Sequence, residues 1–287
     1  MTSGRNAIVA IMEKGLKWIE SLWQTFLSIV KIMLQSKFCT RLPNNPKQGT
    51  LLVLGNGPSL RPLIETKPDL FKDKDLLAVN YAVLSEYYTQ LKPQYYLVAD
   101  PIFFTDETHC NRLFDAMVEK TDWDMCLLLL FQAKNSRLFQ EKIAKNKSIS
   151  VYYFNMTPIE GFKCFSNWCY KKGLGMPRPR NVLVPSIMSG LRLDYKEILV
   201  AGADHSWLKE IWVNEDNIVM EDLNHFYDKK GSEQYVSAKH LHDLLLSMHI
   251  AFKSYHIIND YARSIGAKIY NITQGSYIDA FERRKIN

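Results

Sequence analysis

The sequence has few cysteines, and they do not form pairs with a recognisable spacing. The five cysteines are odd in number, and no two of them form a Cys-x-x-Cys motif. A disulfide framework and a structural zinc site are therefore not indicated. Cysteines of this kind favour a reducing compartment, so we expect a cytoplasmic protein.

The chain also lacks the signatures of a nucleic-acid-binding or disordered protein. Its net charge of +6 over 287 residues is modest, and no zinc-finger, helix-turn-helix or RNP-like pattern is present. A charge of this size suits an anionic substrate or a membrane surface better than nucleic acid. Apolar residues make up 47% and charged residues 23%, which are ordinary values for a globular chain long enough to bury a large core.

No uncharged run near the N-terminus is long enough to span a bilayer. Apolar residues between Ile8 and Leu34 recur with helical spacing, but the longest uncharged stretch, Ser21–Val30, has ten residues. A signal-peptide cleavage site is also missing. A basic amphipathic helix with two tryptophans is typical of an interfacial anchor, which would place the protein peripherally on the inner face of the cytoplasmic membrane. The alternative is a helix packed on the core or on a second subunit.

The remainder of the chain alternates short apolar runs with helix-compatible segments. A linker at Pro43–Pro46 ends the first helix, which predicts a helical segment over 1–45 and one main domain over 46–287. The expected strands are Leu51–Leu54, Leu76–Val79, Tyr95–Ala99, Met125–Leu130, Ser150–Phe154, Ile198–Ala201 and Lys268–Tyr270. The expected helices include Glu107–Glu119, Leu138–Ala144, Val184–Leu193 and Glu233–His249. This alternation predicts an α/β fold with a mainly parallel sheet and helices on both faces.

Two segments interrupt the alternation. Residues 157–180 contain Gly, Pro and basic residues and are expected to form a loop. Residues 205–231 are rich in Trp, Asn, His and acidic residues, and are too long for a simple connection. Long irregular insertions after strands tend to be lids or binding loops, so we expect a lid at about 205–231.

The first expected strand runs directly into a glycine-rich turn, Gly55-Asn56-Gly57-Pro58-Ser59. Two glycines allow a tight turn and a close approach of the backbone to a ligand, and Pro58 and Ser59 suit the first turn of a helix, where phosphate is attracted. The third glycine of the dinucleotide fingerprint and the Gly-Lys-Ser/Thr of a P-loop are both missing. The motif is therefore a nucleotide-binding turn of another kind, or a turn without a ligand.

Polar residues follow several other strands, where ligands of such sheets bind. Asn80 and Asp100 end the second and third strands and could bind ribose or sugar hydroxyls, although each is also a common cap or turn residue. Arg180 precedes a helix expected to begin near Asn181, and the arginine could hold a phosphate or carboxylate group of a ligand. A solvated surface is the alternative for this cation.

The best acid/base candidates lie after the sixth strand. Asp204 and His205 follow Gly202-Ala203, and His225 and Tyr227 come about twenty residues later, inside the expected lid. Imidazole titrates near neutral pH, which suits removal of a proton from an acceptor hydroxyl. Metal binding is a rival interpretation, but the residues lack a recognised ligand spacing. Structural histidines are the other alternative.

Together, these motifs resemble the bacterial family 42 sialyltransferases and the related MptE-like and flagellin-accessory proteins. The resemblance rests on Gly55–Leu60, on Asn80, on Asp100–Phe104, on the stretch from Tyr195 to Asp204, and on the closing Asn271, Ser276 and Phe281. It covers roughly Leu51–Phe104 and Asn181–Phe281. It implies a Rossmann-like domain with a lid that binds a CMP-sugar without metal or other cofactor.

The resemblance also implies roles for individual residues. Gly55, Asn56, Gly57, Ser59 and Asn80 would contact the nucleotide, and His225 matches the lid histidine proposed as general base. Asn181 stands in place of the family's Thr-Ser pair and would also contact the nucleotide. The family's tyrosines after Gly-x-Asp are replaced by His205-Ser206-Trp207. Stabilisation of the leaving phosphate would then fall to His205, Tyr227 or an arginine such as Arg180.

The resulting hypothesis is an inverting transfer of an acidic sugar from CMP to a surface-glycan or lipid-linked acceptor. The sugar would be sialic acid, another nonulosonate or Kdo, and the protein could form a homo-oligomer. One alternative is an MptE-like pterin diphosphokinase, which would use ATP and Mg²⁺ held by Asp100 and Asp204. Another is a non-catalytic accessory protein that keeps the nucleotide fold.

Overall fold

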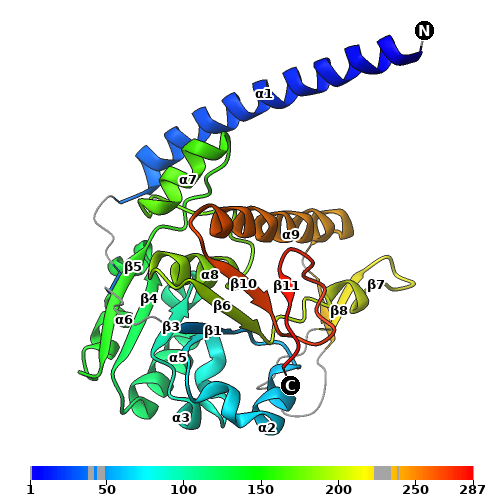
Figure 1. Ribbon diagram of the computed structural model, residues 1–287. Coiled ribbons are helices and arrows are strands. Elements are labelled where there is room, and N and C mark those ends of the chain that lie inside the picture. The colour runs from blue at the N-terminus through cyan, green and yellow to red at the C-terminus, as the bar shows by residue number, and fades with distance from the viewer. Residues whose placement is uncertain (1, 38–41, 44–48, 223–233, 238, 287) are drawn as a thin grey trace.

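An eight-stranded parallel sheet forms the centre of the molecule (Figure 1). The computed structural model describes residues 2–37, 42–43, 49–222, 234–237 and 239–286. The strand order is β11-β10-β6-β1-β2-β3-β4-β5, and every neighbouring pair is parallel. Its strands are β1 (Thr50–Leu54), β2 (Asp75–Val79), β3 (Tyr95–Val98), β4 (Met125–Leu130), β5 (Ile149–Phe154), β6 (Glu197–Ala201), β10 (Lys268–Asn271) and β11 (Glu282–Arg283).

Helices cover both faces of this sheet, as the sequence predicts. One face packs against α7 (Lys163–Lys171), α8 (Leu183–Arg192) and α9 (Leu241–Ser264), and the other against α2 (Leu60–Thr66), α3 (Tyr88–Leu91), α4 (Ile102–Thr105), α5 (Glu107–Lys120) and α6 (Arg137–Ile143). Short 3₁₀ turns are η1 (Pro68–Phe71), η2 (Asn80–Leu84), η3 (Phe131–Asn135) and η4 (Trp207–Lys209). Because both faces are buried, the central strands are continuous apolar runs instead of alternating ones.

The seven expected strands are all present, each within one residue of its expected bounds. Two other expectations are wrong. Residues 157–180 contain α7, a nine-residue helix held by tertiary contact, with the ring of Tyr170 5.3 Å from that of Tyr261 on α9. The helix expected at Glu233–His249 begins only at Leu241. The residues before it include the short strand β9 (Gln234–Val236), which pairs with a distant strand that helical periodicity cannot reveal.

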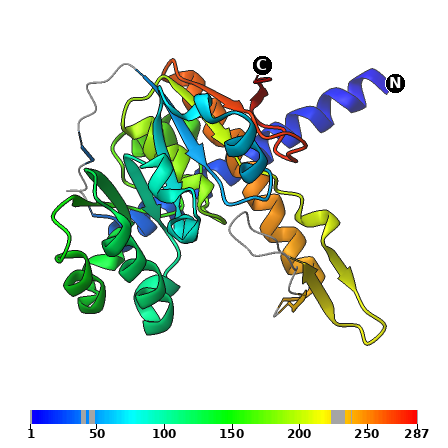
Figure 2. The same cartoon turned by 90° about the horizontal axis from the view of Figure 1, so that it is seen from below.

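The insertion after β6 carries a second, smaller sheet. β7 (Ile211–Val213), β8 (Val219–Asp222) and β9 form three antiparallel strands in sequence order. Figure 2 shows β7 and β8 standing beside the N-terminal part of α9, away from the main sheet. Residues 223–233, which complete the expected lid, lie outside the described residues.

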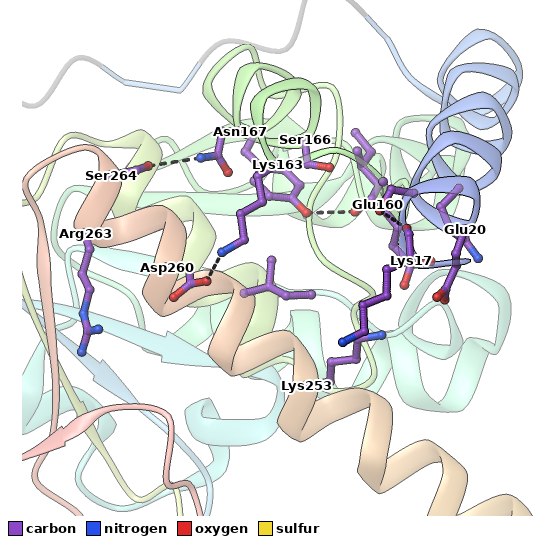
Figure 3. Close-up of a pocket in the computed structure, with 16 residues that line it drawn as sticks. Lys17, Glu20, Glu160, Lys163, Ser166, Asn167, Lys253, Asp260, Arg263 and Ser264 are labelled. Atoms are coloured by element: carbon purple, nitrogen blue, oxygen red, sulfur yellow. Dashed lines mark hydrogen bonds and ion pairs between the residues drawn. The ribbon is translucent and has the colours of Figure 1, made fainter. Parts of the chain in front are cut away.

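The N-terminal helix α1 (Thr2–Gln35) lies across α7 and projects beyond the rest of the molecule (Figure 1). A cleft of about 790 Å³ separates α1 from α7 and α9. Figure 3 shows Lys17 and Glu20 on the side of α1 that lines this cleft, and Lys163 paired with Asp260 between α7 and α9 at 2.7 Å. Within the described residues, no helix is both long enough and apolar enough to cross a membrane.

Candidate functional site at the switch point of the sheet

The strand order reverses between β1 and β6, and two glycine-rich turns meet there. After β1 the chain adds strands in one direction as far as β5, and β6 then returns to the other side of β1. In open α/β sheets, ligands bind at the carboxyl ends of the strands beside such a reversal. The turn after β1 begins at Gly55, and the turn after β6 begins at Gly202. The expected nucleotide-binding turn therefore lies where the fold favours a ligand.

The two turns interlock because their glycines lack side chains. The amide of Gly55 donates to the carbonyl oxygen of Ala201 at 2.8 Å, and the amide of Gly57 donates to that of Gly202 at 2.9 Å. A Cβ atom on Gly57 would lie 1.9 Å from Oδ2 of Asp204, and one on Gly55 would lie 2.4 Å from the carbonyl oxygen of Gly202. Gly202 itself has a φ of +63°, in the left-handed region that favours glycine. These glycines are needed for the turns to touch each other, whether or not a ligand is bound.

Ser59 and Asp204 connect the same two turns through their side chains. Oγ of Ser59 donates to Oδ2 of Asp204 at 2.8 Å. Burial raises the pKa of the Asp204 carboxyl group, and hydrogen bonds from the hydroxyl and amide of Ser59 partly oppose this shift. The structure thus places a carboxylate at the start of α2, where the sequence favoured a phosphate. A phosphate added beside an ionised Asp204 would meet a like charge.

Two of the expected nucleotide-binding asparagines lie next to each other and keep a buried atom unpaired. Nδ2 of Asn56 donates to the carbonyl oxygen of Val79 at 3.3 Å, which brings the Asn56 amide beside Asn80. Oδ1 of Asn56 and Oδ1 of Asn80 are both buried without a hydrogen-bond partner. Asn80 also has a φ of +46°. Unpaired buried acceptors are rare in folded proteins and call for an explanation, such as a bound ligand.

Asn181 belongs to a third part of the site and shows the same feature. Its Oδ1 accepts hydrogen bonds from the amide of Leu183 at 3.0 Å and from the hydroxyl of Tyr255 at 2.9 Å. Its Nδ2 is buried and has no partner. The two donors fix the orientation of the amide, so Nδ2 remains a free donor. Tyr255 lies 2.6 Å from Nε2 of His205 and so links Asn181 to the residue that follows Asp204.

His205 is enclosed in the core. Its side chain is 7% exposed, its ring lies 4.2 Å from that of Trp207, and its φ is +53°. Burial lowers the pKa of this imidazole to about 3, so the ring is neutral at physiological pH. A general base works best with a pKa near the working pH. These surroundings favour a structural role for His205 over an acid/base role.

The remaining predicted residues lie further out or outside the described residues. Asp100 is exposed, and its Oδ1 accepts from the amide of Ile102 at 3.0 Å, as an aspartate in a turn does. Arg180 is exposed beside Asn181. His225 and Tyr227 lie outside the described residues, so their roles stay predictions. Among the residues that are described, no three His, Cys, Asp or Glu side chains gather into a group that could hold a metal ion.

Ser59 also lines a second cleft, which is separate from the one between α1, α7 and α9. It has a volume of about 790 Å³ and lies at the carboxyl ends of β1, β6 and β10. Its cationic lining residues are Lys67, Arg283, Arg284 and Lys285. The guanidinium of Arg283 donates to the carbonyl oxygens of Thr273, Ser276 and Ile278, so this arginine holds the loop after β10 in place. That loop supports the turn after β6, because Oγ1 of Thr273 accepts from the amide of Ala203 at 3.0 Å.

The sequence reasoning missed a polar group beside Asn80. The hydroxyl of Tyr81 lies 2.6 Å from Nδ1 of His109, and the guanidinium of Arg112 lies 4.9 Å from the centre of the Tyr81 ring. His109 and Arg112 are three residues apart on α5, so they share one face of that helix. This spacing was the available signal, but nothing in the sequence indicates that the face meets Tyr81.

Comparisons with known proteins give fold-level likenesses only. No known protein-family profile and no curated protein sequence matches the chain. The solved structures that are similar to it include two glycosyltransferases. One is the MAf glycosyltransferase from Magnetospirillum magneticum AMB-1, with 12% identity and a TM-score of 0.49; the match covers 87% of this chain and 34% of that protein. The other is the sialyltransferase CstII from Campylobacter jejuni, solved with cytidine-5'-monophosphate, with 14% identity and a TM-score of 0.45; the match covers 83% of this chain and 86% of that one.

Proposed function

We propose that this protein is a glycosyltransferase whose nucleotide donor binds across the carboxyl ends of β1, β2 and β6, and that the donor is a CMP-activated acidic sugar. The observation that carries the proposal is the set of unpaired amide atoms on Asn56, Asn80 and Asn181. An unpaired buried polar atom costs about 1–3 kcal/mol, which a ligand bond would recover. The sequence predicts all three residues as nucleotide contacts.

The polarity of the unpaired atoms suits the proposed donor. Asn56 and Asn80 each offer an unpaired acceptor, and these acceptors match the exocyclic amine and the ribose hydroxyls of a cytidine. Asn181 offers a donor, which matches an oxygen of a phosphate or of the sugar carboxylate. Arg180 is the exposed cation next to it. The anionic part of the donor then lies toward Asn181 and away from the carboxyl group of Asp204.

The reaction under this proposal is an inverting displacement without metal. The acceptor hydroxyl transfers its proton to a general base, its oxygen forms a bond to the anomeric carbon, and the bond from that carbon to the phosphate oxygen breaks as CMP leaves. His225 is the proposed base, because His205 is buried and neutral. Tyr227 and Arg180 are proposed to stabilise the charge that develops on the leaving phosphate.

A thermal-shift screen against nucleoside mono- and diphosphates and ATP tests the donor class. A ligand that binds only the native state raises the melting temperature. At a concentration a hundred times its Kd, such a ligand increases the free energy of unfolding by about 2.7 kcal/mol. We expect the largest shift with CMP and a smaller one with UMP, GMP and AMP. An equal shift with all bases, or a larger one with ATP, would contradict the proposal.

The catalytic step is tested by CMP release from CMP-sialic acid, other CMP-nonulosonates and CMP-Kdo. We expect His225→Ala to lower kcat by about 10²–10⁴-fold while CMP still binds, because general-base catalysis typically contributes that much. The matched control is His249→Ala, which removes an exposed histidine of α9. If His225→Ala and wild type turn over at the same rate, the base is assigned wrongly.

A further inference from the structure

The orientation of α1 is the reverse of that found in most helices that pack on a globular domain. Such helices place an apolar stripe against the core and polar residues toward solvent. In α1 the inward side chains are mainly polar: Ser28 is buried, Ser21, Gln24 and Thr25 are partly buried, and Ser36, directly after the helix, is buried as well. Ile32 is the buried apolar exception.

Hydrogen bonds hold this polar side against the loop that precedes α7. Oγ of Ser28 donates to the carbonyl oxygen of Glu160 and accepts from its amide, both at 2.9 Å. Oγ1 of Thr25 accepts from the amide of Phe162 at 3.0 Å. Gly161 lies between these two contacts with a φ of +119°, and a Cβ atom there would be 2.1 Å from Oγ1 of Thr25. The loop is therefore shaped for the polar side of α1, and the helix is not free to turn over.

The opposite side of α1 is apolar from Val9 to Leu34. Successive residues of a helix are rotated by about 100° around its axis. On this basis, every residue between Val9 and Leu34 that lies in the outward arc of about 180° is apolar or glycine. All five charged residues in this stretch fall on the inward half. The large apolar side chains that are more than a third exposed are Val9, Ile11, Met12, Leu16, Trp18, Ile19, Leu22, Trp23, Phe26, Ile29, Met33 and Leu34. We call this set the outer face of α1.

A second copy of the chain fits the outer face poorly. A two-stranded coiled coil buries a narrow seam, and the rows that flank the seam carry complementary charges. A seam along Leu16, Ile19 and Trp23 would leave the flanking Leu22 and Ile29 in water, without any charge to pair. The face is about twice as wide as such a seam, and it continues where α1 projects beyond the body (Figures 1 and 2).

A lipid surface fits the same features. A helix in a membrane interface buries a broad apolar face that includes bulky aromatic residues, and keeps its charged residues on the opposite side. Trp18 and Trp23 lie on the outer face at 58% and 56% exposure, and the described part of the face is long enough, at about 1.5 Å per residue, to lie flat over about 39 Å. The charged residues of the whole helix number four basic and two acidic, which adds attraction to anionic lipids.

We propose that the outer face of α1 binds the surface of an anionic lipid bilayer, with the helix parallel to the membrane and the polar contacts through Ser28 and Thr25 connecting it to the body. The membrane then lies on one side of α1, and α7, α9 and the sheet lie on the other. This proposal is independent of the nucleotide-binding function, because none of the residues that carry it belongs to the switch-point site.

Vesicle flotation with the full-length protein tests this assignment. The vesicles are phosphatidylcholine alone and phosphatidylcholine mixed with phosphatidylglycerol. The variant Trp23→Glu/Phe26→Glu places two charges at the centre of the outer face. The control variant Trp212→Glu/Val213→Glu places two charges on exposed apolar residues of β7. Melting temperatures of both variants verify that the domain is folded.

We expect wild type and the control variant to float with the mixed vesicles. The partition coefficient of Trp23→Glu/Phe26→Glu onto the same vesicles should be lower by a factor of about ten or more. Two results would overturn the proposal at the flotation step: wild type that does not float, or an outer-face variant that floats as well as wild type. A third result that would overturn the proposal comes from light scattering, which measures the oligomeric state. If wild type is a dimer that does not bind vesicles, and the outer-face variant is a monomer, the face is an interface between two copies of the chain.

Discussion

Oγ of Ser59 lies 2.8 Å from Oδ2 of Asp204, and this hydrogen bond joins two turns that are 145 residues apart in the chain. One turn leaves β1 and the other leaves β6, the two strands on either side of the point where the sheet order reverses. The bond explains why a carboxyl group with a raised pKa is tolerated there, since Ser59 satisfies one of its oxygens. It also means that Ser59 is already engaged in the unliganded protein, so we assign recognition of the nucleotide mainly to the neighbouring asparagines.

The first prediction concerns Asn56. Asn56→Ala should weaken CMP binding about five- to tenfold, because one hydrogen bond to the ligand is lost. The unliganded protein should lose little stability, since the substitution also removes a buried acceptor that has no partner. Calorimetric titration with CMP measures the first effect, and thermal melting the second.

The matched control for Asn56 is Asn167→Ala. Asn167 on α7 contacts Ser264 at the end of α9, just before β10 begins. It therefore lies near the amino ends of the strands, whereas the proposed site lies at their carboxyl ends. CMP affinity should be unchanged in this variant. Equal loss of affinity in both variants, or none in Asn56→Ala, would show that the unpaired Oδ1 is not a ligand contact.

A second prediction compares two glycines. Gly57→Ala should destabilise the protein by about 1–3 kcal/mol, because its Cβ would lie 1.9 Å from the Asp204 carboxylate and 2.7 Å from the carbonyl oxygen of Gly202. Gly15→Ala, in the middle of α1 with no atom within 4 Å of the new Cβ, should instead leave stability unchanged or raise it by up to about 1 kcal/mol. Urea unfolding of both variants provides the measurement. A Gly57→Ala protein as stable as wild type would mean that the two turns are further apart than described.

A third prediction uses the buried imidazole of His205. Its pKa is about 3 in the folded protein and 6.5 when exposed, so between these values only the unfolded chain binds the proton. The contribution of His205 to the free energy of unfolding therefore has its full value above pH 6.5, the pKa in the unfolded chain. It decreases as the pH falls from there toward the folded pKa. Between pH 7 and pH 5 it should decrease by about 2 kcal/mol.

The experiment compares wild type with His205→Gln, which keeps a polar partner for Tyr255 but does not titrate. The difference in free energy of unfolding between the two proteins should shrink by the predicted amount from pH 7 to pH 5. The matched control is His249→Gln, which replaces an exposed histidine of α9. A difference that stays constant with pH would mean that His205 is accessible to solvent.

A fourth prediction separates the proposed transfer from pyrophosphoryl transfer. Activity with a CMP-sugar should be the same with EDTA as with added Mg²⁺, because cationic and hydrogen-bonding groups are proposed to stabilise the leaving phosphate. A pterin diphosphokinase would lose essentially all activity in EDTA, since its ATP chemistry needs the metal. CMP release and ATP consumption, each measured with and without EDTA, distinguish the two reactions.

Local pattern was enough to locate the strands and the two turns. Runs such as Leu51–Leu54 and Met125–Leu130 are apolar on both sides, which is what strands covered on both faces require. Gly55 and Gly57 marked the nucleotide turn because glycine is the residue that permits a close backbone approach. Pattern was weakest where an element depends on a distant partner. β9 exists through pairing with β8, and α7 through contact with α9, and neither partner is visible in the local spacing.

The site shows the same division between local and long-range information. Sequence motifs selected Asn56, Asn80 and Asn181 one at a time, each from its place after a strand or before a helix. Their unpaired atoms became apparent only in the folded structure, because pairing depends on groups that lie up to 74 residues away, such as Tyr255 from Asn181. The burial that makes His205 a weak base is likewise a tertiary effect.

By itself, the sequence determined seven strands of the main sheet, its parallel arrangement, the positions of the glycine turns and the amphipathic character of the first helix, since each follows from residue types and their spacing along the chain. The tertiary structure alone decided that Asp204 occupies the start of α2, that His109 meets Tyr81, and that α1 turns its polar side inward and its apolar side outward. The physical reason is that periodicity specifies which side of a helix is apolar, whereas only the hydrogen bonds and close contacts at Thr25, Ser28 and Gly161 specify which side faces the protein.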